Sequence, residues 1–214
     1  MLVPLATFAD REFLVEAEWL AGRIGSRECL SRQIDLVRAS REDLQSVIDE
    51  VPLDPHFADL VELCRGHGVP LTVVSDGLDW VVIKMLARVG LDVPVRANKL
   101  EWLGRNRWRL GFPYSAAACR AQAGHCKCQA LGGEPEKIRI LIGDGRSDFC
   151  AAETADLVVA KGALAEHCQT AGLAYIVFGN FAGATTLIAD WIGGLRRVGQ
   201  MPRSSKGIVH ASPA

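Results

Sequence analysis

The chain has 214 residues, of which 49% are hydrophobic, and its formal net charge at pH 7 is −1. This length suffices for one core with a small accessory domain, and the balanced charge without a long basic run excludes nucleic acid as an expected partner. No apolar stretch reaches membrane length and the first residues lack the features of a signal peptide, so we expect a cytoplasmic protein that does not bind membranes.

The seven cysteines are spaced irregularly. Their odd number in a chain of this size favours reduced thiols over a disulfide framework. Four side chains of metal-ligand types stand close together in sequence: Cys119, His125, Cys126 and Cys128. Because they do not have the spacing of a zinc site, we interpret the segment as a thiol-rich loop, and its role stays open.

The N-terminal quarter is predicted to be helical. Apolar residues recur at three- and four-residue intervals over 11–50, with no strand signal between them. Ser26 is predicted to cap the second helix of this region, and Ser40 the third, whose first turn is acidic. A further helix is expected over about 55–66, before two glycines end it.

From residue 69 the pattern alternates between apolar runs and helical segments. The first two runs are expected to be strands buried on both faces, and a hairpin is expected to turn at Gly104 to Asn106. Helices are expected from Asp79 to about Val89, after Cys126, and between the later strands. The predicted strands lie within 69–77, 93–112, 137–145, 155–161 and 174–178.

This alternation predicts an α/β fold with a doubly wound parallel sheet and right-handed crossovers. Ligands of such sheets bind at the carboxyl ends of the strands. Two polar turns, Ser75-Asp76-Gly77 and Gly143-Asp144-Gly145, follow predicted strands. We therefore expect both turns on the same rim of the sheet.

The acids of the second turn predict a magnesium site. Mg²⁺ prefers hard oxygen ligands and takes one or two carboxylates together with waters and a substrate phosphate. Asp144 follows a strand directly, and Asp148 is expected on the first turn of the next helix, where it would ligate the metal or orient a ligating water. The alternatives are an ordinary Asp-Gly turn and a first-turn acid favoured by the helix dipole.

Three further groups are candidates for binding a phosphoryl group. The Ser75 hydroxyl and the backbone N–H groups of Asp76 and Gly77, expected at a helix start, are suitable donors. Lys127, also expected at a helix start, would neutralise phosphate charge. The alternatives are a Ser-Asp pair that caps a helix and a surface lysine.

The order Ser75, Lys127, then Gly143-Asp144-x-x-x-Asp148 resembles motifs two, three and four of the haloacid dehalogenase superfamily. Four stretches resemble the phosphoserine-phosphatase-like branch, in particular the subgroup related to the methionine-salvage phosphatase of 2-hydroxy-3-keto-5-methylthiopentenyl-1-phosphate. These stretches are "FADREFLVEAEWLAGRIGSRECLSRQIDLV", "VVSDGLD", "NKLEW…RWRLGFP" and "CKC". The resemblance covers about residues 5 to 192.

The resemblance implies a division of the chain and roles for its residues. Residues 1–54 would form a helical cap and 55–198 the α/β core with a hairpin insertion near 98–113, followed by a disordered tail over 199–214. Ser75 and Gly77 would bind the phosphoryl group and Lys127 would stabilise it. Asp144 would ligate Mg²⁺ with support from Asp148, and the cap, with the hairpin around Trp102 and Trp108, would close over the substrate.

One motif of that superfamily is missing. Its first motif, Asp-x-Asp, supplies the nucleophile that forms an aspartyl-phosphate and the general acid, and no Asp-x-Asp occurs in this sequence. The nearest imitation, Asp10 with Glu12, aligns better with the first cap helix. Loss of the central strand that carries this motif would leave buried ladder groups unpaired at about 1–3 kcal/mol each. We therefore expect a truncated chain whose complete form carries the motif upstream, and no activity of this chain alone.

The leading hypothesis is thus a magnesium-dependent phosphomonoesterase lineage that acts on a small phosphorylated metabolite. The substrate stays open between a methylthiopentenyl phosphate, phosphoserine and another small phosphate. A second hypothesis is a non-enzymatic phosphate-ligand-binding protein that has lost the nucleophile. A phosphotransferase or dehalogenase of the same fold is a third. The sequence does not indicate an oligomeric state.

Overall fold

A computed structural model describes residues 9–132 and 137–197. The chain divides into two compact units, each assembled from separate stretches of sequence. The first unit comprises Met1–Pro52 with Thr72–Lys127, and the second comprises Leu53–Leu71 with Cys128–Ala214. The tail predicted from 199 lies outside the described residues, and the division into cap and core stays a prediction.

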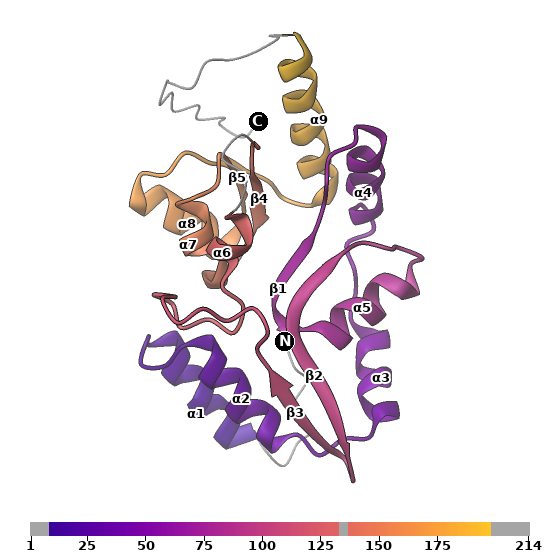
Figure 1. Cartoon of the computed structure of the whole chain (residues 1–214), viewed down its shortest axis with the longest axis vertical. Coiled ribbons are helices and arrows are strands. Elements are labelled where there is room, and N and C mark those ends of the chain that lie inside the picture. Colours follow the sequence, from indigo (N-terminus) through magenta and orange to yellow (C-terminus); the bar gives the residue numbers. More distant parts are fainter. Residues whose placement is uncertain (1–8, 133–136, 198–214) are drawn as a thin grey trace. The chain divides into compact units, whose positions relative to one another are not determined.

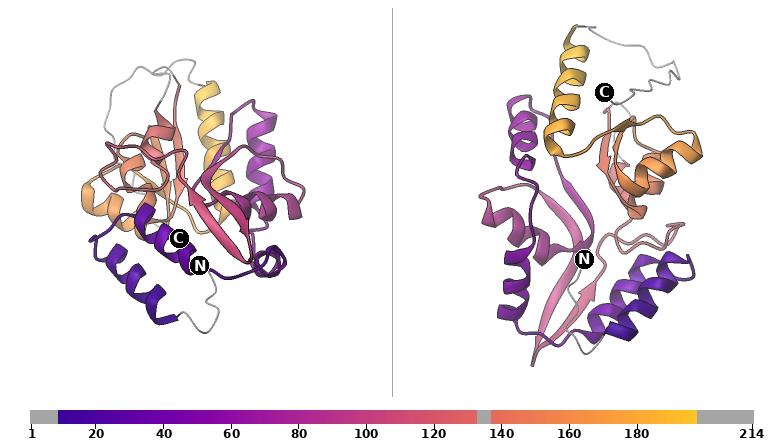
Figure 2. Two further views of the ribbon diagram at one scale, coloured as in Figure 1. Left: turned by 60° about the horizontal axis from the view of Figure 1, so that its bottom comes forward. Right: turned by 180° about the vertical axis from the view of Figure 1, so that it is seen from behind.

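The first unit combines helices with a three-stranded sheet (Figure 1). Its elements are α1 (Ala9–Leu20), α2 (Ser26–Leu36), α3 (Arg41–Glu50), β1 (Val73–Leu78), α5 (Asp79–Arg88), β2 (Val95–Gly104) and β3 (Arg107–Gly111). Helix α2 packs on β3 and α1 packs on α2, whereas α5 packs on β2 and α3 packs on α5. The two helix pairs lie on opposite sides of the β2–β3 hairpin (Figures 1 and 2).

The two serines predicted to cap helices behave differently. Ser40 caps α3 in a capping box: the Asp43 N–H donates to Ser40 Oγ at 3.0 Å, and the Ser40 N–H donates to Asp43 Oδ2 at 2.8 Å. Ser26 is instead the first residue of α2, and its hydroxyl donates to the Asp76 carboxylate. The predicted Ser26 cap is therefore wrong, because a charged acceptor distant in sequence takes the hydroxyl.

The predicted hairpin is confirmed. Strand β2 runs parallel to β1 along its first part and antiparallel to β3 along its second, where Trp102 pairs with Trp108. The turn residues Arg105 and Asn106 have φ of +52° and +57°. Two successive positive φ angles are typical of the type I′ turn, whose twist matches that of the flanking strands.

The second unit contains a parallel sheet of order β4-β5-β6 and helices from both of its stretches. Its elements are α4 (Phe57–Gly66), α6 (Lys127–Leu131, which begins at the last residue of the first unit), β4 (Ile140–Gly143), the 3₁₀ turn η1 (Arg146–Asp148), α7 (Phe149–Ala152), β5 (Leu157–Ala160), α8 (Gly162–Ala171), β6 (Ile176–Val177) and α9 (Phe181–Arg197). Helix α4 packs against α9, and α7 packs against α8.

The predicted α/β class with parallel strands is confirmed, but the described strands form two three-stranded sheets. Within the described residues, β1 pairs only with β2 and β4 only with β5. The expectation that β1 and β4 are buried on both faces is wrong, since most of their residues are half-buried. Strand β5, which has a neighbour on each side, is buried over Val158–Ala160. An edge strand lacks the neighbour that would cover it.

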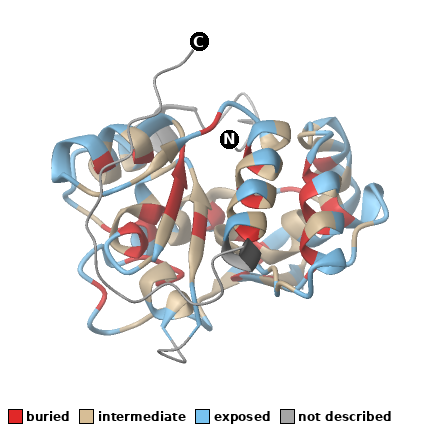
Figure 3. Cartoon of the chain, turned by 90° about the horizontal axis from the view of Figure 1, so that it is seen from above, coloured by how far each residue is buried: buried red, intermediate tan, exposed pale blue. Residues whose placement is uncertain are grey.

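Each unit has its own buried cluster, and Figure 3 shows buried residues on the strands and on single faces of helices. The cluster of the first unit contains Ile34, Leu78, Leu100 and Trp108, and that of the second contains Leu141, Ala151, Ala152, Val158, Ala160, Leu164 and Cys168. Trp108 also donates its Nε1–H to the Ala39 carbonyl at 2.9 Å. Among the described helices, none combines the length and apolar character needed to cross a membrane.

Candidate functional site

Ser75, Asp76 and Gly77 lie within β1, as a bulge. Val74 pairs with Arg96 and Leu78 pairs with Asn98. Between these two pairs β1 advances by four residues while β2 advances by two. The prediction that this segment forms a turn at a helix start is therefore wrong, because α5 begins only at Asp79. A bulge bends a strand and re-aims its side chains, which is common next to binding sites.

The bulge holds Ser75 and Gly77 close to each other. The Gly77 N–H donates to Ser75 Oγ at 3.0 Å, and a Cβ on Gly77 would lie 3.1 Å from the same oxygen. Because the serine oxygen accepts this bond, its own hydrogen remains to be donated to a ligand. The half-buried Ser75 hydroxyl thus fits the predicted role of phosphoryl donor, which stays a prediction.

The Asp76 side chain is engaged within the first unit. Its Oδ1 accepts the His125 N–H at 2.8 Å and lies 3.4 Å from Asn98 Nδ2, and its Oδ2 accepts the Ser26 hydroxyl. Its backbone carbonyl accepts a second contact from Asn98 Nδ2, at 2.7 Å. Only the backbone N–H of Asp76 therefore remains a candidate for binding substrate.

Lys127 is half-buried and is the first residue of α6, as predicted. The segment that leads to it is buried, and the His125 ring stacks on Tyr114 with centroids 4.7 Å apart. Burial lowers the pKa of His125 below its ordinary value of 6.5, against the opposing effect of the Asp76 charge. The described residues contain only free cysteines and no group of three or more metal-ligating side chains.

The two acids of the predicted metal site differ in exposure. Asp144 follows β4 directly and is exposed, whereas Asp148 is 4% exposed and ends η1, just before α7. Asp148 Oδ2 accepts the Gly145 N–H at 3.1 Å, and a Cβ on Gly143 would lie 2.7 Å from that oxygen. One exposed and one buried carboxylate in a tight turn fit the one or two that magnesium takes.

The sequence-predicted residues thus divide between the units. Ser75, Asp76, Gly77 and Lys127 belong to the first, whereas Asp144 and Asp148 belong to the second. Within the first unit, Asp76 connects the bulge to the segment before Lys127. The expectation of one shared rim stays a prediction.

The hairpin tryptophans line a pocket of about 700 Å³ within the first unit. Trp102 and Trp108 meet edge to face with centroids 4.8 Å apart, and Arg41 lies over the Trp102 ring. Helices α3 and α5 supply the other walls, including Trp80. The proposed closure of this hairpin over a substrate stays a prediction.

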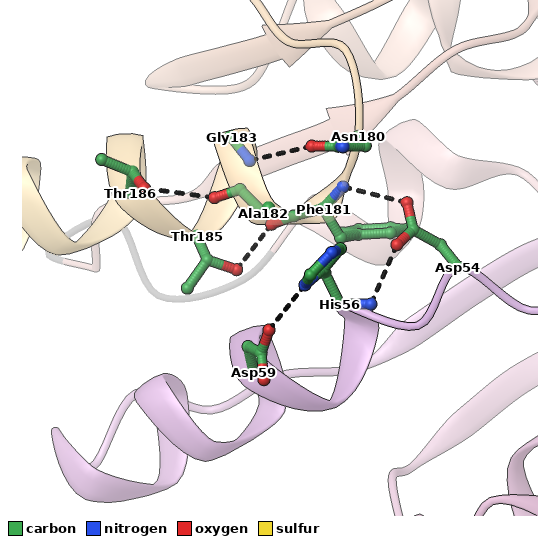
Figure 4. A network of polar contacts seen from close by, with 9 residues as sticks. All are labelled: Asp54, His56, Asp59, Asn180, Phe181, Ala182, Gly183, Thr185 and Thr186. Carbon is green, nitrogen blue, oxygen red and sulfur yellow. Dashed lines mark hydrogen bonds and ion pairs between the residues drawn. The ribbon is translucent and has the colours of Figure 1, made fainter.

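Sequence reasoning missed two groups of polar residues. The first is the set of donors around Asp76, for which the only signal was a polar residue, Asn98, inside a strand. The second is Asp54, whose carboxylate accepts the His56 N–H at 2.9 Å and the Phe181 N–H at 3.0 Å, at the starts of α4 and α9 (Figure 4). The bond from Phe181 joins parts of the second unit that are 127 residues apart.

Comparison with known proteins places these elements in a family. Residues 4–153 match the model of haloacid dehalogenase-like hydrolases. Among curated relatives, the 2-hydroxy-3-keto-5-methylthiopentenyl-1-phosphate phosphatase of Brevibacillus brevis is 29% identical over 168 residues, covering 76% of this chain and 75% of the relative. The phosphatase of the same name from Geobacillus kaustophilus is 30% identical over 171 residues, with 76% of each chain covered.

Solved structures support the fold. The phosphoserine phosphatase of T. onnurineus superposes with a TM-score of 0.58 at 18% identity, over 85% of this chain and 82% of that one. A probable phosphoserine phosphatase from Vibrio cholerae gives 0.67 at 18% identity, over 94% and 61%. Since the family model matches well over half of the sequence and the fold agrees, the chain belongs to the haloacid dehalogenase-like hydrolase family.

Proposed function

We propose that this protein belongs to a magnesium-dependent phosphatase lineage that acts on a small phosphorylated metabolite. The observation that carries the proposal is the acidic turn after β4, where exposed Asp144 stands beside a buried Asp148 that folds back onto Gly145. The names of its relatives support a phosphate ester, with a methylthiopentenyl phosphate or phosphoserine as the leading substrates.

Each site residue has a distinct task in this proposal. Ser75 donates its hydroxyl hydrogen to a phosphoryl oxygen, and Lys127 compensates the phosphoryl charge. Asp144 holds magnesium, with Asp148 fixing the turn that carries it. When bound, the metal supplies charge neutralisation at the phosphoryl oxygens.

The nucleophile is the open part of the reaction. The sequence contains no Asp-x-Asp, and Asp10 is the second residue of helix α1. We therefore propose that the described residues bind and orient a phosphoryl group, and that turnover needs a carboxylate that they do not supply. This chain alone is then expected to be inactive.

The test is hydrolysis of small phosphate esters with added Mg²⁺, using this chain and a form extended by whatever its upstream DNA encodes. Activity of the extended form alone is the expected result. In an active form, Asp144→Asn should abolish magnesium-dependent turnover, and Lys127→Ala should lower the rate by at least about 100-fold with the fold intact. Hydrolysis by the 214-residue chain would refute the proposed lack of a nucleophile.

A second candidate function is binding of a phosphorylated ligand without hydrolysis. It is favoured by the presence of Ser75, Lys127 and Asp144 in a sequence that lacks Asp-x-Asp. Stop codons directly upstream, together with ligand binding that weakens in Ser75→Ala, would support it over the phosphatase.

A further inference from the structure

Asp76 stands between the two phosphoryl-binding candidates of the first unit. In the chain it lies within the β1 bulge, directly after Ser75. In space its carboxylate meets three other segments, through Ser26 of α2, Asn98 of β2 and the backbone of His125. The segment with His125 leads after two residues to Lys127, so Asp76 connects one candidate to the other.

The donors around Asp76 are buried. Asn98 is 0% exposed, His125 is 1% exposed and Ser26 is 8% exposed. A buried donor that loses its acceptor is destabilised by its full desolvation free energy. The donors of Ser26, Asn98 and His125 therefore fix the position of the carboxylate, and the carboxylate fixes theirs. Their arrangement has little freedom to relax while the unit stays folded.

The segment before Lys127 is fixed through the same centre. The Gly124 N–H donates to Ser26 Oγ at 3.3 Å, and Ser26 in turn donates to Asp76. A Cβ on Gly124 would lie 2.7 Å from Asn98 Nδ2, so the backbone passes directly over that amide. The Cys126 N–H donates to the Tyr114 carbonyl at 3.0 Å, and α6 begins at the next residue.

A role of Asp76 in the chemistry itself is disfavoured. Both oxygens of the Asp76 carboxylate already accept hydrogen bonds from Ser26, Asn98 and His125, so they are engaged within the protein and not directed at a ligand. The geometry instead gives it a task of orientation, since small displacements of binding groups are costly for recognition and catalysis.

We propose that Asp76 is the positioning residue that holds the Ser75 bulge and the start of α6 in the arrangement that binds a phosphoryl group. This inference rests on the proposed function of Ser75 and Lys127. The charge and both oxygens of the Asp76 carboxylate are needed for this, because three donors converge on it. Asparagine in its place keeps the size but offers a single accepting oxygen.

The experiment compares Asp76→Asn with Asp79→Asn in the full chain. Asp79 is the matched control, because its Oδ1 accepts the Trp80 and Leu100 N–H groups at 2.6 and 2.9 Å. Among the described residues, its hydrogen bonds do not reach the segment before Lys127. Amide hydrogen exchange of Gly124 and His125, and binding of tungstate as a tetrahedral phosphate mimic with Mg²⁺, are measured for both.

Asp76→Asn should speed exchange at Gly124 and His125 and weaken tungstate binding at least about tenfold, whereas Asp79→Asn should leave both within about twofold. Unchanged exchange, or faster exchange with unchanged binding, would overturn the inference. Binding that weakens in Ser75→Ala and Lys127→Ala but not in Asp76→Asn would overturn the inference alone. Tungstate binding that neither Ser75→Ala nor Lys127→Ala weakens, or none at all, would overturn the proposed function and this inference with it.

Discussion

Single residues decide the shape of the acidic turn after β4. A Cβ on Gly143 would lie 2.7 Å from Asp148 Oδ2 and 3.1 Å from Leu164 Cδ2. We expect Gly143→Ala to lower the free energy of unfolding by about 1–3 kcal/mol, because the buried carboxylate must move away from the Gly145 N–H. Urea denaturation of the purified protein measures this loss.

Gly145→Ala is the matched control in the same turn. Its Cβ would come no closer than 3.9 Å to Asp148 Oδ2, and its φ of −121° suits any residue. A cost below about 0.5 kcal/mol is expected, as for a tolerated surface substitution. Equal losses from both substitutions would contradict the contact with Asp148 as the cause.

His125 makes the stability of the first unit depend on pH. Burial lowers its folded pKa, while Asp76 and the carbonyls of Arg96 and Ser75 oppose the shift and Lys127 adds to it. Below about pH 6.5 the unfolded state takes up a proton that the folded state resists. The contribution of neutral His125 to the free energy of unfolding is therefore fully present above about pH 6.5. It is lost as the pH falls through the lowered pKa of the folded state.

The measurement is the urea midpoint at pH 7.5 and pH 5.5 for the unsubstituted chain and His125→Gln. The substitution removes the titrating ring, so its midpoint should change less between the two values. His67→Gln, at an exposed position, serves as control and should keep the full change. An equal pH response of His125→Gln would show that other groups cause the loss.

At the scale of elements, the sequence predicts features that adjacent residues determine, but not contacts between residues that are distant in the chain. The Ser40 capping box spans four residues, and the hairpin turn spans two, so their sequences suffice to predict them. Ser26 also stands at the start of a helical pattern, but it has Cys29 where Ser40 has Asp43, and the partner of its hydroxyl lies 50 residues away. The bulge in β1 likewise depends on its register with β2, which the apolar run "LTVV" cannot report.

Two helices of the second unit begin at one carboxylate. Asp54 accepts the His56 and Phe181 N–H groups, and the Phe181 bond in particular lowers the pKa of Asp54 below its ordinary value of 3.8 (Figure 4). The Phe57 and Phe181 rings pack edge to face beside it, with centroids 5.0 Å apart. The carboxylate therefore fixes how α4 and α9 meet.

Asp54→Ala should lower the unfolding free energy by about 0.5–2 kcal/mol, the usual cost of removing a helix cap. Because the folded pKa is depressed, this contribution is present above about pH 3.8 and is lost as the pH falls through the lowered value. Asp59→Asn, at an exposed position where the carboxylate pairs with the neighbouring His56, should cost less. A loss that persists unchanged at pH 2.5 would exclude the charge as its source.

At the scale of the molecule, the sequence predicted the α/β class, the order of elements and the strand end that carries Asp144. The sequence also led to the expectation that a central strand is missing, and among the described residues β1 and β4 lie in separate sheets and each pairs on one side. It could not predict that most residues of β1 and β4 are half-buried, because an apolar run reports only that a strand avoids water. The hydrogen bonds around Asp76 could not be predicted either, since its partners stand 22, 49 and 50 residues away in the sequence.

Each unit has its own sheet and its own buried cluster. A substitution in one unit should therefore destabilise that unit and leave the other unchanged. The contacts that Asp54→Ala breaks all belong to the second unit, and those that Asp76→Asn breaks all belong to the first. In native-state hydrogen exchange, Asp54→Ala should speed exchange in β5 and leave β2 and β3 unchanged, and Asp76→Asn should do the reverse. Faster exchange of all three strands in either variant would mean that the chain opens as one cooperative whole.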